Sequence, residues 1–254
     1  MKSFQMKALA LAMLGLGGLV MAGSAAAACP TDPAQPNGAW SSKSVASDSV
    51  LSIVTPGLNS TSCALSVQVN TGALSNTRAY VTDTSPQDEP HYRARFYIGL
   101  SGLSGFSLSN QQVKIFDAFA NTSPVNVGTD EVVIRLIGGA TPFLRFYVAD
   151  SAQAANYKII NATLPSSATN SYRVEFDLQQ GAPGNFRYWV SDAAASTSDA
   201  SPTGTYAPNN SGWSGVTQIN LGLFNTSPNF RSNNANQAIV LDEFDSRRQT
   251  FIGQ

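Results

Sequence analysis

The sequence predicts an all-β fold of antiparallel strands, built as a sandwich or a barrel. Beyond residue 60, short segments of alternating apolar and polar residues recur, and Gly, Pro, Asn or Ser stands in nearly every gap between them. No segment after the N-terminal leader keeps the 3.6-residue period of an amphipathic helix, and no alternation of strands and helices indicates a parallel sheet. Many short strands at this spacing are typical of sandwiches and barrels, which often form a single domain of this length.

The chain begins with a segment typical of a secretory signal peptide. Lys2 and Lys7 form a short positive region, an uncharged apolar stretch follows, and residues 26–28, all alanine, fit a cleavage site of the A-x-A type. The stretch is also long enough for an uncleaved membrane anchor, which is the alternative. Because glycine and alanine are frequent in it, we expect residues 1–28 to be removed. The mature protein would then be secreted or periplasmic, with no membrane span after cleavage.

The sequence contains two cysteines, Cys29 and Cys63. In an exported protein a lone pair favours one disulfide, which would tie the mature N-terminus to the first predicted strand. The alternative is a lipoprotein anchored through Cys29, but that residue lacks the large aliphatic side chain expected shortly before it, and acylation would leave Cys63 unpaired. Residues 29–57 are rich in Pro, Ser, Asn and Asp. They are predicted to form an N-terminal arm on a single β-sandwich domain at 58–254.

Eleven segments are predicted to be strands from their alternation and from the turn residues around them. They are residues 63–70, 78–83, 91–100, 111–120, 131–138, 142–150, 157–163, 171–179, 186–192, 216–225 and 238–247. Residues 193–215 have no apolar period and are full of turn formers. We therefore expect a long loop there, and we expect it to be the most mobile part of the domain outside the arm.

One predicted strand carries two arginines, in the segment HYRARFY. Read with the two-residue period of a strand, Tyr92 and Phe96 share one face, and Arg93 and Arg95 share the other. We expect the aromatic face to be buried and the arginines to be exposed. Strands that carry Arg side by side repel one another, so we also expect at least one of these arginines to pair with a carboxylate on an adjacent strand. The candidate partners are Glu175, Asp177 and the acidic residues of 242–245.

Four other predicted strands also carry Arg on the non-core face, mostly beside an aromatic residue or a carboxylate. One hypothesis is a face that binds a sugar, since Trp and Tyr stack on apolar ring faces while Arg and carboxylates bond hydroxyls. The other is a solvated face covered by cross-strand ion pairs, each contributing about 0.2–1 kcal/mol. The candidate ligand-binding residues are Arg93, Arg95, Arg145, Tyr147, Glu175, Arg187 and Trp189.

The sequence contains no recognisable catalytic or metal-binding motif, so no catalytic residue, metal ligand or cofactor is predicted. His91 is the only histidine, and no nucleophile motif lies near it. Glu243 and Asp245 are spaced as strand neighbours, near the carboxyl separation of retaining glycosidases. Arg247 follows at once, so we interpret the segment as a self-neutralising strand end. Calcium at oxygen-rich turns is left open.

The charge of the chain argues against nucleic acid as a partner. The sequence has 15 Lys and Arg against 16 Asp and Glu, and no basic run. Binding to phosphates requires concentrated positive charge.

Four segments resemble those of a known family. AYVTDTSPQDEPHYRARFYIG and LDEFDSRRQTFIG, with YRVEFDL and FRYWVSD between them, resemble bacterial secreted domains of the laminin-G-like, concanavalin A-like jelly-roll type. The resemblance covers roughly residues 58–254 and implies two packed antiparallel sheets. It implies no catalytic residues, because this fold hosts lectins, glycanases, lyases and adhesion modules alike.

The leading hypothesis from the sequence is a secreted, non-catalytic carbohydrate- or surface-binding protein, whose partner would be a glycan or a cell-surface ligand. A polysaccharide-degrading hydrolase or lyase is the first alternative. A structural envelope protein is the second.

Overall fold

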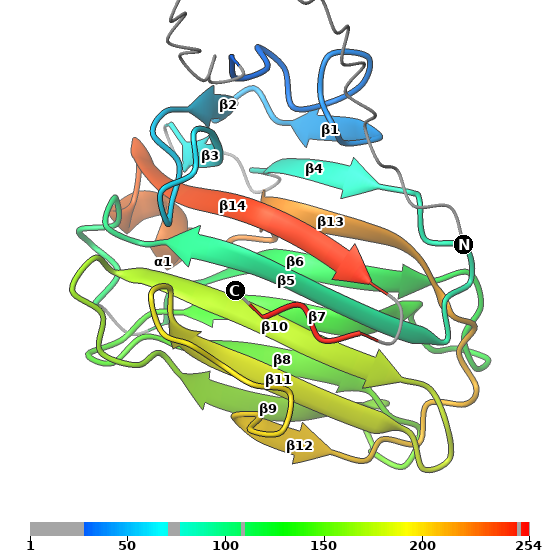
Figure 1. Ribbon diagram of the computed structural model, residues 1–254. Helices are drawn as coiled ribbons and strands as arrows, with labels where there is room; N and C mark the ends of the chain where they lie inside the picture. The colour runs from blue at the N-terminus through cyan, green and yellow to red at the C-terminus, as the bar shows by residue number, and fades with distance from the viewer. Residues whose placement is uncertain (1–27, 71–76, 108–109, 248–249, 254) are drawn as a thin grey trace, which may run out of the picture.

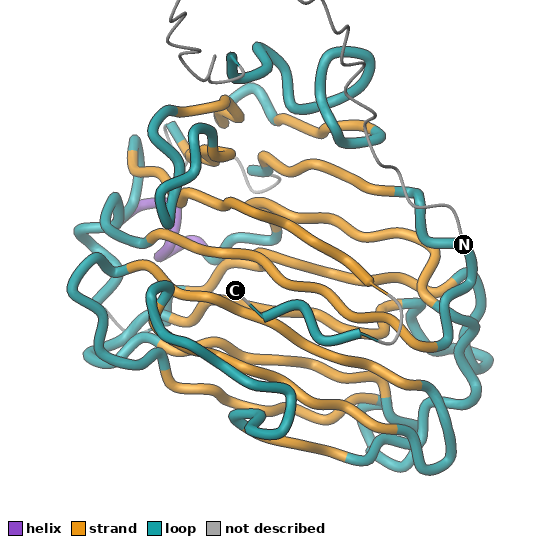
Figure 2. Tube along the Cα trace, viewed as in Figure 1, coloured by secondary structure: helices purple, strands orange, loops and turns teal. Residues whose placement is uncertain are grey.

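The protein is a sandwich of two antiparallel sheets of seven strands each, so the predicted all-β jelly-roll fold is confirmed. The computed structural model describes residues 28–70, 77–107, 110–247 and 250–253. The predicted signal peptide lies almost wholly outside these residues. Figure 1 shows the two sheets as layers, and Figure 2 shows how short loops connect their strands.

Sheet 1 contains, in spatial order, β1 (Ser42–Val45), β4 (Ala79–Asp83), β13 (Val216–Phe224), β6 (Gln112–Ala120), β7 (Asp130–Ile137), β8 (Phe143–Ala149) and β9 (Tyr157–Thr163). Sheet 2 contains β12 (Gly204–Tyr206), β11 (Asn185–Asp192), β10 (Ser171–Gln179), β5 (His91–Gly99), β14 (Gln237–Arg247), β3 (Ala64–Val69) and β2 (Ser49–Val54). The short helix α1 (Pro228–Asn233) precedes β14, and Ser227 caps it by accepting a hydrogen bond from the Phe230 amide.

The core lies between the two sheets and is rich in phenylalanine. Phe96 and Phe116, from opposite sheets, stack with ring centroids 5.8 Å apart, and Phe176 meets Phe116 edge to face at 5.3 Å. Tyr92 and Phe96 are both buried there, which confirms the predicted inward face of β5. Each such side chain contributes about 1.5–3 kcal/mol through burial.

The predicted N-terminal arm is wrong in part. Residues 29–41 are irregular, but β1 and β2 form the edge strands of the two sheets, so the sandwich begins well before residue 58. These strands are short and Ser-rich; β1 is mostly exposed and β2 mostly half-buried, and both therefore give a weak alternation signal. The predicted disulfide is confirmed: Cys29 and Cys63 are bonded, so Cys29 has no free thiol for acylation.

The predicted loop at 193–215 is more structured than its composition indicates. It contains β12, which pairs with β11. Trp213 is buried and donates through Nε1 to the Gly128 carbonyl at 3.1 Å, and the Tyr206 hydroxyl donates to Asp150. Its mobility stays a prediction. Among the described residues, no helix has the length and apolar character needed to cross a membrane.

Candidate functional site

Five of the seven predicted ligand-binding residues lie together on the outer face of sheet 2, the face turned away from the core. Cross-strand pairing places Glu175 of β10 between Arg95 of β5 and Trp189 of β11. In the same way, Asp177 lies between Arg93 and Arg187. The period-2 pattern therefore assigned these side chains to the correct face of their strands.

This face is covered by the C-terminal residues 250–253, which cross it above β5 and β10 (Figure 1). The amides of Ile252 and Gly253 donate to the two carboxylate oxygens of Glu175 at 3.0 and 3.1 Å. The Gly253 carbonyl accepts from Arg95 at 2.8 Å. The Phe251 ring lies 5.4 Å from the ring of Trp189, so the segment is held by both polar and aromatic contacts.

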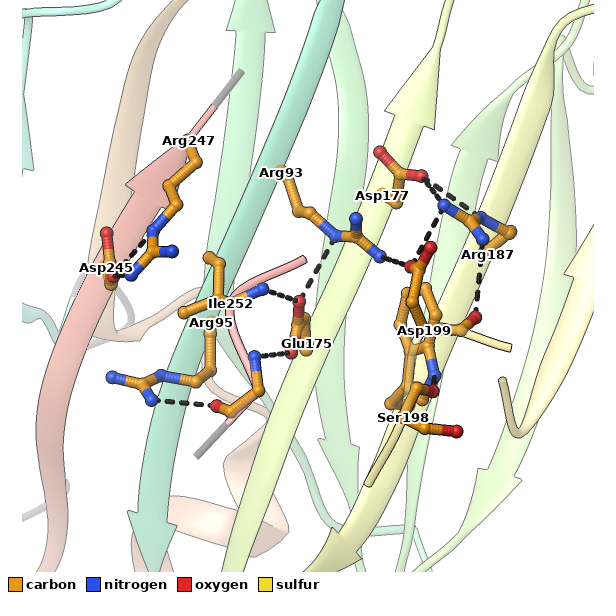
Figure 3. Close-up of polar contacts among 12 residues, drawn as sticks. Arg93, Arg95, Glu175, Asp177, Arg187, Ser198, Asp199, Asp245, Arg247 and Ile252 are labelled. Carbon is orange, nitrogen blue, oxygen red and sulfur yellow. Dashed lines mark hydrogen bonds and ion pairs between the residues drawn. The ribbon is translucent and has the colours of Figure 1, made fainter. Parts of the chain in front are cut away.

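The prediction that Arg93 and Arg95 are exposed is wrong, since they are only 1% and 9% exposed. They do not enter the core between the sheets. They lie beneath the C-terminal segment and the β11–β12 loop, whose Asp199 bonds Arg93 at 2.6 Å. The predicted cross-strand pairing is confirmed, because Arg93 Nε lies 3.2 Å from Glu175 (Figure 3).

A second set of ion pairs completes this covered surface, which we call the polar layer (Arg93, Glu175, Asp177, Arg187 and Asp199). Arg187 bonds Asp177 at 2.7 Å and Asp199 at 3.3 Å. His91 Nε2 lies 2.7 Å from the other carboxylate oxygen of Asp177, within hydrogen-bonding distance. Trp189 donates its indole N–H to the Ser198 carbonyl at 3.0 Å. Charges of opposite sign are thus interleaved around the buried Arg93, Glu175 and Asp177, as burial requires, and this surface is closed to a large ligand in the structure.

The other two predicted residues, Arg145 and Tyr147, lie on the opposite side of the molecule, on the outer face of sheet 1. The seven residues proposed from the sequence to form one binding face therefore lie on two different faces. Strand parity indicates which side of its own strand a residue occupies. It does not indicate which of the two sheets the strand joins.

Three cations stand side by side across the outer face of sheet 1. Lys114 of β6 pairs in register with Arg135 of β7, which pairs with Arg145 of β8. We call these three residues the cationic row. Arg145 in turn faces Asn161 of β9, whose side-chain oxygen accepts from Arg145 Nε at 2.9 Å. Like charges directly opposite each other destabilise a sheet, so this row is costly in the free protein.

A groove of about 350 Å³ is lined by two residues of the cationic row, Lys114 and Arg135, and by two tyrosines. The rings of Tyr147 and Tyr157 meet edge to face with centroids 5.2 Å apart. The Arg135 guanidinium lies 5.7 Å from the Tyr147 ring. Tyr157 is 40% exposed and its neighbour Ile159 46%, so an apolar, aromatic surface is open to solvent here. The groove is lined by Gln112, Lys114, Asp130, Val133, Arg135, Tyr147, Ala149, Tyr157 and Asn225.

One buried carboxylate adjoins the groove. Asp117 of β6 is 1% exposed and accepts from Lys114 at 2.8 Å. Burial raises the pKa of Asp117 to about 6, and the nearby Lys114 opposes that rise. Asp117 faces Asn220 of β13 in register. The site therefore offers cations, hydroxyls and one titratable acid near neutral pH.

The residues predicted from the sequence do not include Lys114, Asp117 or Tyr157. A signal for Lys114 and Asp117 exists in the segment KIFD, where both leave the core face, but a β-bulge between them shifts the strict alternation. Tyr157 begins an edge strand and gives little periodic signal. Within the described part of the chain, no group of three or more His, Cys, Asp or Glu side chains is arranged to hold a metal ion.

Comparisons with known proteins indicate relatives in fold. No family profile and no curated protein matches the sequence. Among solved structures, the endo-beta-1,4-glucuronan lyase from the fungus Trichoderma reesei is similar with a TM-score of 0.57 and 16% identity, over 83% of this chain and 91% of that one. The cellulose induced protein Cip1 is similar with a TM-score of 0.53 and 14% identity, over 82% and 90% of the two chains.

A marine PL-14 alginate lyase from Aplysia kurodai has a TM-score of 0.53 at 12% identity, over 78% of this chain and 87% of that one. At these identities the similarities define the class by fold alone: this chain is a jelly-roll β-sandwich whose solved neighbours include polysaccharide lyases.

Proposed function

We propose that this protein is secreted and binds an acidic polysaccharide in the groove on the outer face of sheet 1. The observation that carries the proposal is the cationic row. Lys114, Arg135 and Arg145 occupy adjacent strands in register. Of these three, Lys114 is paired with Asp117, and no ion pair joins Arg135 or Arg145 to an acid among the described residues. A bound polyanion would remove the repulsion within the row, and Arg pairs with carboxylates through two parallel hydrogen bonds.

The aromatic residues of the groove support a sugar as the repeating unit. Tyr147 and Tyr157 present ring faces and edges beside the cations. A uronate residue has both an apolar ring face, on which Tyr stacks, and a carboxylate, to which Arg bonds. Two of the similar structures are named as lyases of glucuronan and of alginate. The polysaccharide-degrading alternative is therefore favoured over purely non-catalytic binding.

We infer β-elimination as the reaction in that case. This reaction needs a cation to neutralise the uronate carboxylate, a base to remove the adjacent proton and an acid to protonate the leaving oxygen. Arg135, which lines the groove, fits the first role, and Arg145 lies beside it in register. Tyr147 and Lys114 border the same groove and are the candidate proton-transfer groups, with Asp117 positioning the Lys114 amine.

The test is to incubate the protein with glucuronan, alginate and a neutral glucan. Cleavage is followed by the ultraviolet absorbance of the unsaturated uronate end, and binding by affinity electrophoresis. We expect retention and cleavage with an acidic polysaccharide only. Retention without cleavage would return the non-catalytic hypothesis to first place. Silence with every acidic polysaccharide, or equal retention by the neutral glucan, would refute the proposal.

A further inference from the structure

A second pocket lies at one edge of the sandwich beneath residues 35–41, and its chemical character differs from that of the cationic row. Its volume is about 490 Å³. Leu65 of β3, Leu221 of β13 and Leu241 of β14 form its apolar floor, so it reaches the space between the two sheets. Trp40 and Phe244 form an aromatic wall with ring centroids 5.0 Å apart. Its volume lies in the range typical of small-molecule sites, and its lining combines this apolar part with polar side chains.

The ionisable residues that line this pocket are all acidic: Asp83, Asp242 and Glu243. Two of them are engaged within the protein. Asp242 accepts from the Leu58 amide at 2.7 Å and from the Thr61 hydroxyl, and Asp83 accepts twice from Ser85. Within the described residues, the Glu243 carboxylate has no hydrogen bond or ion pair to the protein, so it is available to a ligand.

The backbone at Glu243 is arranged in an unusual way to line this pocket. A β-bulge between Asp242 and Asp245 lets Phe244 pack toward the core, while Asp245 lies opposite Arg95 in the strand register and forms its ion pair with Arg247. Glu243 adopts a φ of 46° in this bulge. Among the described residues it is the one non-glycine residue with positive φ inside a strand. Bulges commonly re-aim side chains at functional sites, and such a conformation persists only where the surroundings enforce it.

We propose that this pocket binds an organic ammonium ion with an apolar body. The Leu floor would remove the body from water, and the ammonium group would lie between the Trp40 ring and the Glu243 carboxylate. A cation over an indole face is stabilised by the ring quadrupole, and a carboxylate adds direct charge pairing. Three carboxylates disfavour an anion. The pocket thus has the opposite charge preference to the groove of sheet 1, and the two proposals are independent.

Three probes that share one ring test this inference: benzylammonium, benzyl alcohol and benzoate, titrated calorimetrically into the full-length protein. We expect benzylammonium to bind about tenfold more tightly than benzyl alcohol, and benzoate to bind least. Affinity for benzoate equal to or above that for benzylammonium would overturn the proposal. So would equal affinity for benzylammonium and benzyl alcohol.

A matched pair of variants locates the site. Glu243→Gln keeps the side-chain volume and should abolish the preference for benzylammonium over benzyl alcohol. Asp245→Asn, two residues along the same strand and outside the pocket, should leave that preference unchanged. A preference that survives in Glu243→Gln, or that is lost equally in Asp245→Asn, would show that the pocket is not the site. Because the probe series uses the wild-type protein, it decides the proposal even where a variant does not fold.

Discussion

Replacing Arg135 by Gln should raise the free energy of unfolding and at the same time weaken polysaccharide binding. Arg135 has two like-charged cross-strand neighbours, Lys114 and Arg145. Each direct opposition costs roughly 0.2–1 kcal/mol, so removing the central charge should recover about 0.4–2 kcal/mol. Loss of the contact between the Arg135 guanidinium and the Tyr147 ring should lower this gain in the free energy of unfolding by about 0.5 kcal/mol. A net gain near 1 kcal/mol corresponds to a Tm higher by about 2–4 °C in a domain of this size.

Thermal unfolding followed by circular dichroism at low and high salt checks this prediction. The gain should shrink at high salt, because the Debye length falls from about 30 Å at 0.01 M to about 3 Å at 1 M. Arg187→Gln is the matched control, since that arginine lies in the polar layer between Asp177 and Asp199 and its loss should destabilise the protein. A lower Tm for Arg135→Gln at low salt, or a gain that is independent of salt, would refute the reasoning.

Three further predictions concern stability. Burial raises the pKa of Glu131 from its usual 4.5 to about 8, so between these pH values the folded state retains a proton that the unfolded state releases. The free energy of unfolding should therefore fall by on the order of 3–5 kcal/mol as pH rises through this range. Urea unfolding of Glu131→Gln should lack that fall, and the same pH dependence in wild type and variant would contradict the prediction. The disulfide joins residues 34 apart, so reductant, or Cys63→Ser, should remove about 3–4 kcal/mol; no change in the urea midpoint would count against it. Glu175→Ala should cost about 3–5 kcal/mol by leaving Arg93 under-compensated, and should speed carboxypeptidase digestion; unchanged digestion would show that Glu175 does not hold the C-terminal segment.

Strand parity could be predicted from the sequence because alternation is fixed by the backbone itself. In β5, Tyr92 and Phe96 are an even number of residues apart, so they share one face of the strand, and that face is the inward one. Cross-strand pairing of Arg93 with an acid could be predicted for a related reason, because like charges in adjacent strands are unfavourable. The disulfide followed from a count of two cysteines.

The burial of the same arginines could not be predicted in this way. It depends on Phe251, Ile252 and Gly253, which lie more than 150 residues after Arg93 and form no strand of their own. Short irregular segments carry no periodic signal, and their docking is decided by tertiary contacts. The division of β5 and β8 between two different sheets is likewise a property of the topology, and it separated Arg145 and Tyr147 from the other five predicted residues.

The two outer faces differ in how their charges are distributed, and this difference points to sheet 1 as the working surface. In the polar layer, Asp199 lies between Arg93 and Arg187, and Asp177 is paired as well, so the charges are compensated within the protein. A single carboxylate at position 135 would achieve the same for Arg145 and would add to the pairing of Lys114 with Asp117, because that position is in register with both cations. The chain places an arginine there instead, which adds two repulsions among half-buried side chains. Asp117 offsets the charge of Lys114. The repulsion between Arg135 and Arg145 is relieved by an anion from outside the protein or by solvent screening. The salt dependence of Arg135→Gln separates these two cases when it is measured with and without an acidic polysaccharide. If the row is a binding site, the polysaccharide should reverse the sign of the substitution, making wild type the more stable protein.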